Sequence, residues 1–113
     1  MLGLRTPVTE IKWSETEEKI AQVAFDKAYQ RETTALIEEI RQYTGAIATL
    51  DDTWRLHDFL SSRRHDIDGK YDYRYPVLLF VFARLVQEKW LDLSELDGLD
   101  REKLAKIASI AMM

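Results

Sequence analysis

The sequence predicts an all-α protein in which a long helical stem carries a small helical head. Apolar residues recur at helical spacing along most of the chain. Only four glycines and two prolines occur in 113 residues, which favours long helices. Apolar residues make up 46% and charged residues 32% of the chain, as in folded rather than disordered proteins.

Composition also limits the function classes. The formal charge of −4 argues against nucleic-acid binding, because a phosphate-binding surface needs a concentrated positive field. The absence of cysteine excludes disulfides, thiolate catalysis and cysteine-based zinc sites. Met1 to Trp13 contains no apolar segment of signal-peptide length, so we expect one cytoplasmic domain.

The first helix is expected to begin after a flexible arm, residues 1–13. Ser14 and Glu17 form a capping-box pattern, which marks a helix start. From Ser14 to about Leu50 nothing forbids a continuous helix, although Gly45 weakens the pattern locally.

Two apolar stripes follow this predicted helix. The longer one has the four-and-three spacing of a heptad seam, which is typical of helices that pack lengthwise. Its members are Phe25, Tyr29, Leu36, Ile40, Tyr43, Ile47 and Leu50. The shorter stripe faces elsewhere and consists of Ile20, Val23, Ala24 and Ala28.

The length of this helix bears on its packing. A helix over residues 14–50 would be roughly 55 Å long, whereas a compact domain of this size has a radius of gyration of about 13 Å. Either the helix breaks near Gly45 or a second chain covers its seam. We favour a homodimer that buries Leu36, Ile40, Tyr43, Ile47 and Leu50. The alternative is a hairpin in which the next helix folds back on the first.

That next helix is expected over Asp51–Tyr71 as the last part of the stem, residues 14–75. Asp51 and Asp52 suit the N-cap and first turn, and Gly69 suits the left-handed conformation that ends helices. The face predicted to be buried consists of Leu56, Phe59, Leu60, Ile67 and Tyr71.

The opposite face of this helix is the candidate functional surface. It holds Trp54, Asp58, Ser61, His65 and Asp68, with His57 and Arg64 on its flank. Tryptophan and arginine are the residues that most often anchor protein interfaces. The alternative is that Trp54 packs in the stem core or the dimer seam. Arg63 projects from the apolar face, so we expect it to snorkel or to cross the dimer seam.

The head is expected over residues 76–113. Pro76 suits the first turn of a helix, and the apolar run Val77–Ala83 is too short and too charged at its end to span a bilayer. We therefore expect a buried helix. Ser94 is expected to cap a short turn and Asp100 a last helix.

The aromatic residues of the head are expected in its core. Phe80 and Phe82, together with Leu79, fit a core more readily than a ligand pocket. The last helix is expected to bury an apolar face made of Leu104, Ile107, Ala108 and Ala111.

Catalysis and metal binding find little support. His57, Asp58 and Ser61 contain the letters of a nucleophilic triad, but on one helix their side chains radiate from a common axis. His57 and His65 are two turns apart, so an ion between them would need other ligands. The charges around Arg63, Arg64 and His65 are balanced by nearby aspartates, and local pairing is their expected role.

The string TWRLHDFLSSRRHDIDGKYDYR at residues 53–74, with FVFARL at residues 80–85 and AYQRE at residues 28–32, resembles the fluorescence recovery protein family of cyanobacteria. The resemblance is strong from Ala28 to about Leu91. An uninterrupted pattern of this length is far more specific than a short motif.

This resemblance implies a helical homodimer without pigment, cofactor or covalent chemistry. It implies binding of the light-activated red form of the orange carotenoid protein, chiefly at its C-terminal domain. The partner would return faster to its orange form and leave the phycobilisome, which ends photoprotective quenching. The family's functional cluster falls on Trp54, His57, Asp58 and Arg64, and a second patch falls on Phe80 and Lys106.

Three residues depart from the pattern of the family. Thr53, near the implied dimer seam, stands where leucine is expected, Tyr73 where aspartate is expected, and Trp90 where glycine is expected. These departures suggest a divergent member with the cluster intact. The competing class is a homodimeric adaptor that uses the same face for another partner.

Overall fold

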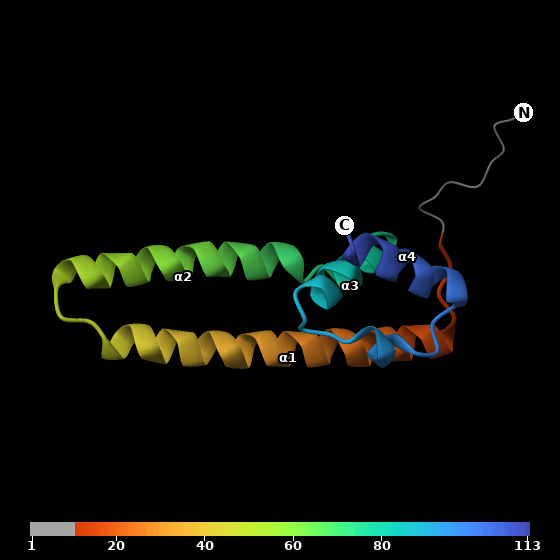
Figure 1. The fold of residues 1–113 in the computed structure, drawn as a ribbon, viewed down its shortest axis with the longest axis horizontal. Coiled ribbons are helices and arrows are strands. Elements are labelled where there is room, and N and C mark those ends of the chain that lie inside the picture. The colour runs from red at the N-terminus through yellow and green to blue at the C-terminus, as the bar shows by residue number, and fades with distance from the viewer. Residues whose placement is uncertain (1–10) are drawn as a thin grey trace, which may run out of the picture.

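The stem hairpin and the C-terminal head pack along the same long helix (Figure 1). The computed structural model describes residues 11–113, and within them the chain forms helices and no strand. The helices are α1 (Glu15–Gly45), α2 (Leu50–Lys70), α3 (Leu78–Gln87), α4 (Arg101–Ala111) and the 3-10 helices η1 (Tyr75–Val77) and η2 (Leu93–Leu96). The longest dimension is 65 Å and the radius of gyration 18.1 Å. The predicted all-α class is therefore confirmed.

The helix α1 begins where the sequence predicts and ends earlier. The Ser14 hydroxyl accepts the Glu17 N–H at 3.1 Å, and the Glu17 carboxylate accepts the Ser14 N–H at 3.0 Å, which completes the predicted capping box. A continuous helix to Leu50 is wrong, because α1 ends at Gly45. Glycine is a poor helix former. A side chain at position 45 would contact no other atoms within 4 Å.

A second capping box starts α2. The Thr49 hydroxyl accepts the Asp52 N–H at 3.1 Å, and Asp52 accepts the Thr49 and Ala48 N–H groups at 3.1 and 3.0 Å. The N-cap is therefore Thr49 rather than Asp51 or Asp52. The two boxes bracket a short reversal, after which α2 runs back along the C-terminal half of α1 (Figure 1). The hairpin that the sequence left as an alternative is the arrangement observed within the chain.

The end of α2 differs from the prediction at Gly69. This glycine lies inside the helix, and its backbone is not left-handed. The helix continues to Lys70, whose buried side chain bonds to α1 and α3, and the Tyr71 N–H donates to the Ile67 carbonyl at 3.2 Å. Contacts made by Lys70 thus determine the end of the helix.

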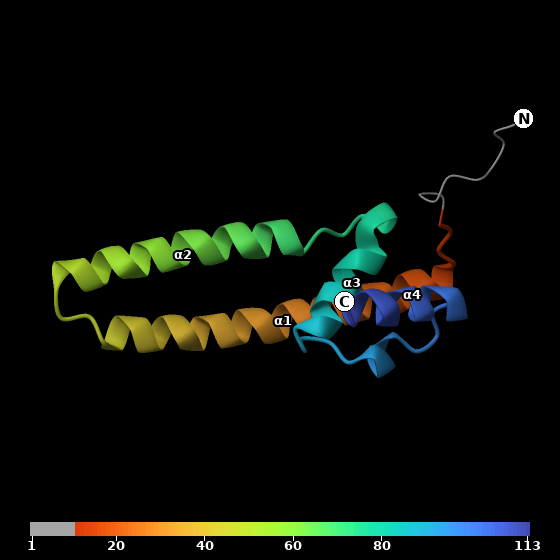
Figure 2. The same cartoon turned by 45° about the horizontal axis from the view of Figure 1, so that its top comes forward.

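The main core lies in the head, over the N-terminal half of α1 (Figure 2). Small residues of α1 allow the head to approach closely, and the last helix contributes Ile107. The fully buried members are Ala21, Ala24, Ala28, Leu78, Phe82, Ala83, Leu85, Leu96 and Ile107. Of the predicted second stripe, Val23 remains exposed.

The helix α3 buries one side, as predicted for Leu79 and Phe82. The prediction that Phe80 also joins the core is wrong, because Phe80 is 61% exposed. At about 100° per residue, Phe80 points roughly away from Leu78 and Phe82. A continuous apolar run therefore includes one residue that faces outward.

Residues before α1 pack on the head. The Trp13 ring lies 5.5 Å from the Tyr75 ring, and the Lys103 ammonium group lies 4.9 Å over the Trp13 ring. Ile11 also contacts the core. Residues 1–10 of the predicted arm lie outside the described residues.

The starts of η1 and α4 agree with the prediction, and the start of η2 differs from it. Pro76 lies in the first turn of η1, as expected. The cap of η2 is Asp92 rather than Ser94, because the Asp92 carboxylate accepts the Ser94 N–H. Asp100 is the N-cap residue of α4, although its side chain makes no capping bond.

A buried ion pair fastens α4 to the start of α1. Lys103 donates to the two oxygens of the Glu17 carboxylate at 2.9 and 3.1 Å, and the Asp100 N–H donates to it at 2.7 Å. Burial alone would raise the pKa of Glu17. The hydrogen bonds from Ser14, Asp100 and Lys103 outweigh burial and lower the pKa to about 2. The ionised carboxylate is therefore part of the folded head.

Among residues 11–113, no helix combines the length and apolar character needed to cross a bilayer.

The Glu17 carboxylate predicts acid sensitivity. Since its folded pKa of about 2 lies below the ordinary value of 4.5, its contribution is present above pH 4.5 and is lost as pH falls towards 2. A lowering of the pKa from 4.5 to about 2 corresponds to roughly 3 kcal/mol of stability at neutral pH. Urea unfolding should show Glu17→Gln less stable than the parent at pH 7, with the gap narrowing steadily as pH falls from 4.5 towards 2. The control is Glu18→Gln, an exposed neighbour. A gap that stays constant with pH would contradict this role.

Candidate functional site

The outward surface of α2 carries the predicted cluster. Trp54 is 56% exposed, and His57, Asp58 and Arg64 are exposed with it. Ser61, His65 and Asp68 complete this face and are also exposed. The reading of Trp54 as a core residue of its own chain is therefore wrong. We call Trp54, His57, Asp58 and Arg64 the α2 cluster.

The charges of the α2 cluster are held loosely. Arg64 Nε lies 3.8 Å from Asp68 Oδ2, one turn along the same helix, and His57 Nδ1 lies 3.4 Å from Asp58 Oδ1. Each pair is local to α2, and each side chain is mostly exposed. Exposed pairs of this kind contribute little to stability. These charges therefore contribute little to the fold of the described residues.

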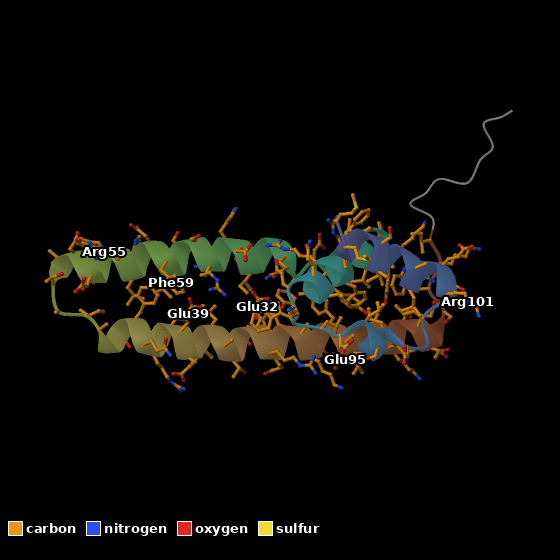
Figure 3. The ribbon with its side chains drawn as sticks, in the orientation of Figure 1. Glu32, Glu39, Arg55, Phe59, Glu95 and Arg101 are labelled. Atoms are coloured by element: carbon orange, nitrogen blue, oxygen red, sulfur yellow. The ribbon has the colours of Figure 1, made fainter. Side chains whose placement is uncertain are left out.

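The neighbouring Arg63 has a different role. It donates to Glu39 of α1 at 2.9 Å, lies 3.9 Å from Glu32, and stands 5.6 Å over the Phe59 ring. The expectation that Arg63 snorkels or crosses a dimer seam is thus replaced by a bridge inside the hairpin. Figure 3 shows Glu32, Glu39 and Phe59 pointing into the space between α1 and α2, while Arg55 points away.

The stem has little core of its own. No residue from 33 to 66 is buried, and of the α2 face predicted to be buried only Ile67 is. Leu56, Phe59 and Tyr71 are half-buried, and Leu60 is exposed. Two helices alone leave one side of such a face open.

The residues predicted for a dimer seam lie along this hairpin. Leu36 and Ile40 are half-buried, whereas Ile47, Leu50 and Thr53 are exposed. Tyr43 stacks on Phe59 of α2, with ring centroids 4.5 Å apart, and stays 40% exposed.

A shallow groove runs between the helices beside the α2 cluster. It has a volume of about 330 Å³. Its lining comes from both helices and consists of Tyr29, Thr33, Leu36, Leu60, Arg63, Arg64, Ile67 and Asp68. Arg64 therefore borders both the apolar groove and the exposed cluster.

The second predicted patch lies on the head, apart from the α2 cluster. Phe80 projects from α3 and Lys106 from α4, and both are exposed. Lys106 and Leu79, the neighbour of Phe80, line one hollow together with Lys103. The structure thus places Phe80 and Lys106 on the same unit, and the α2 cluster on the stem.

The residues considered for catalysis lie on the surface of one helix. His57, Asp58 and Ser61 are all exposed on α2, where side chains radiate from a common axis. Within residues 11–113, no group of three or more histidine, aspartate or glutamate side chains could hold a metal ion.

Sequence reasoning missed an ionic network where the stem meets the head. Lys70 and Glu32 are each 2% exposed and lie 2.7 Å apart. Glu88, Arg84 and Asp66 extend this contact to α3. One signal in the sequence could have indicated this network. Phe25, Ala28 and Glu32 are three and four residues apart, so the charged Glu32 lies on the apolar inner face of α1.

Comparison with known proteins decides the family. Residues 13–111 match the family model described as "Photoprotection regulator fluorescence recovery protein". The chain belongs to this family. The fluorescence recovery protein of Synechocystis sp. is 44% identical over 104 residues, which cover 92% of this chain and 95% of the relative.

Solved structures of the fluorescence recovery protein family agree with this fold. The chain aligns with the Fremyella diplosiphon protein at a TM-score of 0.88 and 56% identity, and with the Synechocystis protein at 0.87 and 44%. Each alignment covers 90% of this chain and 100% of the solved chain. The resemblance in sequence therefore extends to the whole fold, and the family is one of photoprotection regulators.

Substitution of the adjacent residues Arg63 and Arg64 should affect stability to different extents. Arg64→Leu should change the free energy of unfolding by less than about 0.5 kcal/mol, because Arg64 is exposed and paired only locally. Arg63→Leu should cost roughly 1.5 kcal/mol, because it leaves Glu39 without its charged donor. Urea midpoints at one protein concentration measure both. Equal losses would refute the distinction.

Proposed function

We propose that this chain binds the light-activated red form of the orange carotenoid protein, chiefly at its C-terminal domain. Binding accelerates return of that partner to the orange form and its detachment from the phycobilisome, which ends fluorescence quenching. The chain acts without covalent chemistry, pigment or metal, in the cytoplasm beside the phycobilisomes. Membership of a family of photoprotection regulators supports this proposal.

One observation carries the proposal: Trp54 is exposed among charges that the fold does not use. A tryptophan 56% exposed on a helix leaves a large apolar surface in water. Asp58 lies one turn from Trp54, and Arg64 lies about 15 Å from Trp54 along the same helix. Both have only weak local partners. This combination suits an interface with an aromatic anchor and orienting charges.

Acceleration follows from unequal binding. A protein speeds a conformational change only if it binds the transition state between two arrangements more tightly than the starting arrangement. The α2 cluster would hold one domain of the activated partner, with Trp54 supplying buried area. Asp58 and Arg64 would set its orientation, and the head patch would guide the other domain back.

The stem also supports a homodimer. With no residue from 33 to 66 buried, the hairpin lacks the core that two helices need for stability. A second hairpin packed on the same side would complete a four-helix arrangement and cover Leu36, Ile40 and Ile47. Tyr43, Leu50 and Thr53 would lie in or beside this seam.

The first test follows the dark recovery of photoactivated orange carotenoid protein by absorbance. Substoichiometric amounts of the chain should accelerate recovery over many turnovers. Arg64→Leu should weaken binding by roughly 2 kcal/mol, a factor of about 30, and slow recovery accordingly. The matched control is Arg41→Leu, since Arg41 is an exposed arginine of α1 that pairs with Glu38 of the same helix.

An unchanged recovery rate with Arg64→Leu would remove the α2 cluster from the mechanism. No acceleration by the parent chain, folded and dimeric, would favour an adaptor role for the same surface.

The second test concerns the dimer. Ile40→Asp should shift the protein from dimer to monomer in sedimentation velocity, because it places a charge in the apolar side of the hairpin. The control Val23→Asp changes an equally apolar residue that is 55% exposed and lies outside the seam stripe. A parent chain that sediments as a monomer, or an Ile40→Asp variant that stays dimeric, would contradict the assigned seam.

A further inference from the structure

Lys70 lies where three helices meet. Its buried ammonium group donates bonds of 2.7 Å to Glu32 on α1 and 2.7 Å to Glu88, the C-cap residue of α3. Asp66, one turn earlier in α2, lies 3.8 Å from Lys70 Nζ and accepts a 2.8 Å bond from Arg84 of α3. Because a buried ammonium group needs anions around it, these contacts constrain the end of α2.

Two ion pairs join α2 to α3 directly. We call Lys70–Glu88 and Asp66–Arg84 the α2–α3 junction. The bond from Arg84 lowers the pKa of Asp66. Burial would raise the pKa of Glu88, but its bonds to Lys70 and Arg84 outweigh burial and lower it. Both carboxylates are therefore charged at neutral pH, and the junction is intact there.

The junction is the main direct tie between α2 and the head. The head packs on α1 through a continuous apolar core, to which α2 contributes no buried residue. Arg63–Glu39 and the stack of Tyr43 on Phe59 tie α2 to α1 alone. The buried Lys70–Glu32 bond sets the register of α2 along α1. The direct constraints on the angle of the α2 surface against the head are the junction and the short segment, residues 71–74, that follows α2.

We propose that Arg84 and Glu88 are positioning residues that fix the distance and angle between the α2 cluster and the head patch of Phe80 and Lys106. Both surfaces then contact one partner molecule at once. This inference rests on the proposed function above. Fixed spacing favours such two-site binding, because the second contact forms at high effective concentration only when the geometry permits it.

The variant that tests this is Arg84→Gln/Glu88→Gln. It removes one positive and one negative charge, so the net charge stays the same. Arg84 and Glu88 are 44% and 34% exposed, and Lys70 keeps Glu32, so no buried charge is left without a partner. The matched control is Arg31→Gln/Glu95→Gln, which removes an ion pair of 2.7 Å between α1 and η2 without contact to α2.

The first readout is independent of any partner. Cysteines placed at the exposed Ser62 of α2 and Ser109 of α4 carry spin labels, because the chain has no cysteine of its own. Labelled chains are diluted in unlabelled chains, so that only distances within one chain are measured by electron double resonance. The distance distribution should be narrow in the parent and control, and broad in the junction variant.

The second readout is a double-mutant cycle on partner affinity. Phe80→Ala should weaken binding of the orange carotenoid protein in the parent and control. In the junction variant the same substitution should have an effect smaller by at least about threefold. Arg64→Leu should weaken binding in all three backgrounds. A role of the junction in stability alone would leave the effect of Phe80→Ala unchanged.

A distance distribution that stays narrow in the junction variant would overturn the proposal. So would a broad distribution combined with an undiminished effect of Phe80→Ala. If the parent chain fails to bind this partner, the proposed function fails while the distances still decide whether the junction positions α2. A broad distribution with a lost Phe80 effect supports the whole inference.

Discussion

The buried bond between Lys70 and Glu32 constrains the rest of the molecule. It crosses from α2 to α1 at the point where stem and head meet, and both side chains are almost fully buried. Tyr71 donates to the same carboxylate at 2.7 Å. Burial and the neighbouring Glu32 raise the pKa of the Tyr71 phenol, so it remains a donor. A buried carboxylate with these donors allows only one register of α2 along α1.

Local signals in the sequence predicted much of the architecture. The Ser14 capping box, the apolar run before Ala83 and the N-cap position of Asp100 depend on residues a few positions apart, and the structure has all three. The outward face of α2 followed from helical periodicity. The exposed Trp54 was identified because it lies on the polar side of a helix.

The features that sequence missed depend on contacts between distant residues. Glu32 meets Lys70 across 38 positions, and Arg63 meets Glu39 across 24. Phe80 faces outward because the core covers only one side of α3. The continuous apolar run does not reveal this, and only the family resemblance had placed Phe80 in a surface patch. The break near Gly45 was one of two open alternatives, but the start of α2 was placed at Asp51 and Asp52, although the cap is Thr49.

The stem hairpin and the head differ in the sequence separation of the contacts that form them. Residues 46–49 alone join α1 to α2, so closing the hairpin costs little chain entropy, whereas Glu17 meets Lys103 across 86 positions. Short loops close quickly and long ones slowly, so contacts between α1 and α2 are expected to form before α4 reaches the start of α1, even though the hairpin has little core of its own. Until α4 docks, the buried side of α3 stays in water. Misassociation during folding is therefore expected to begin at α3 rather than in the stem.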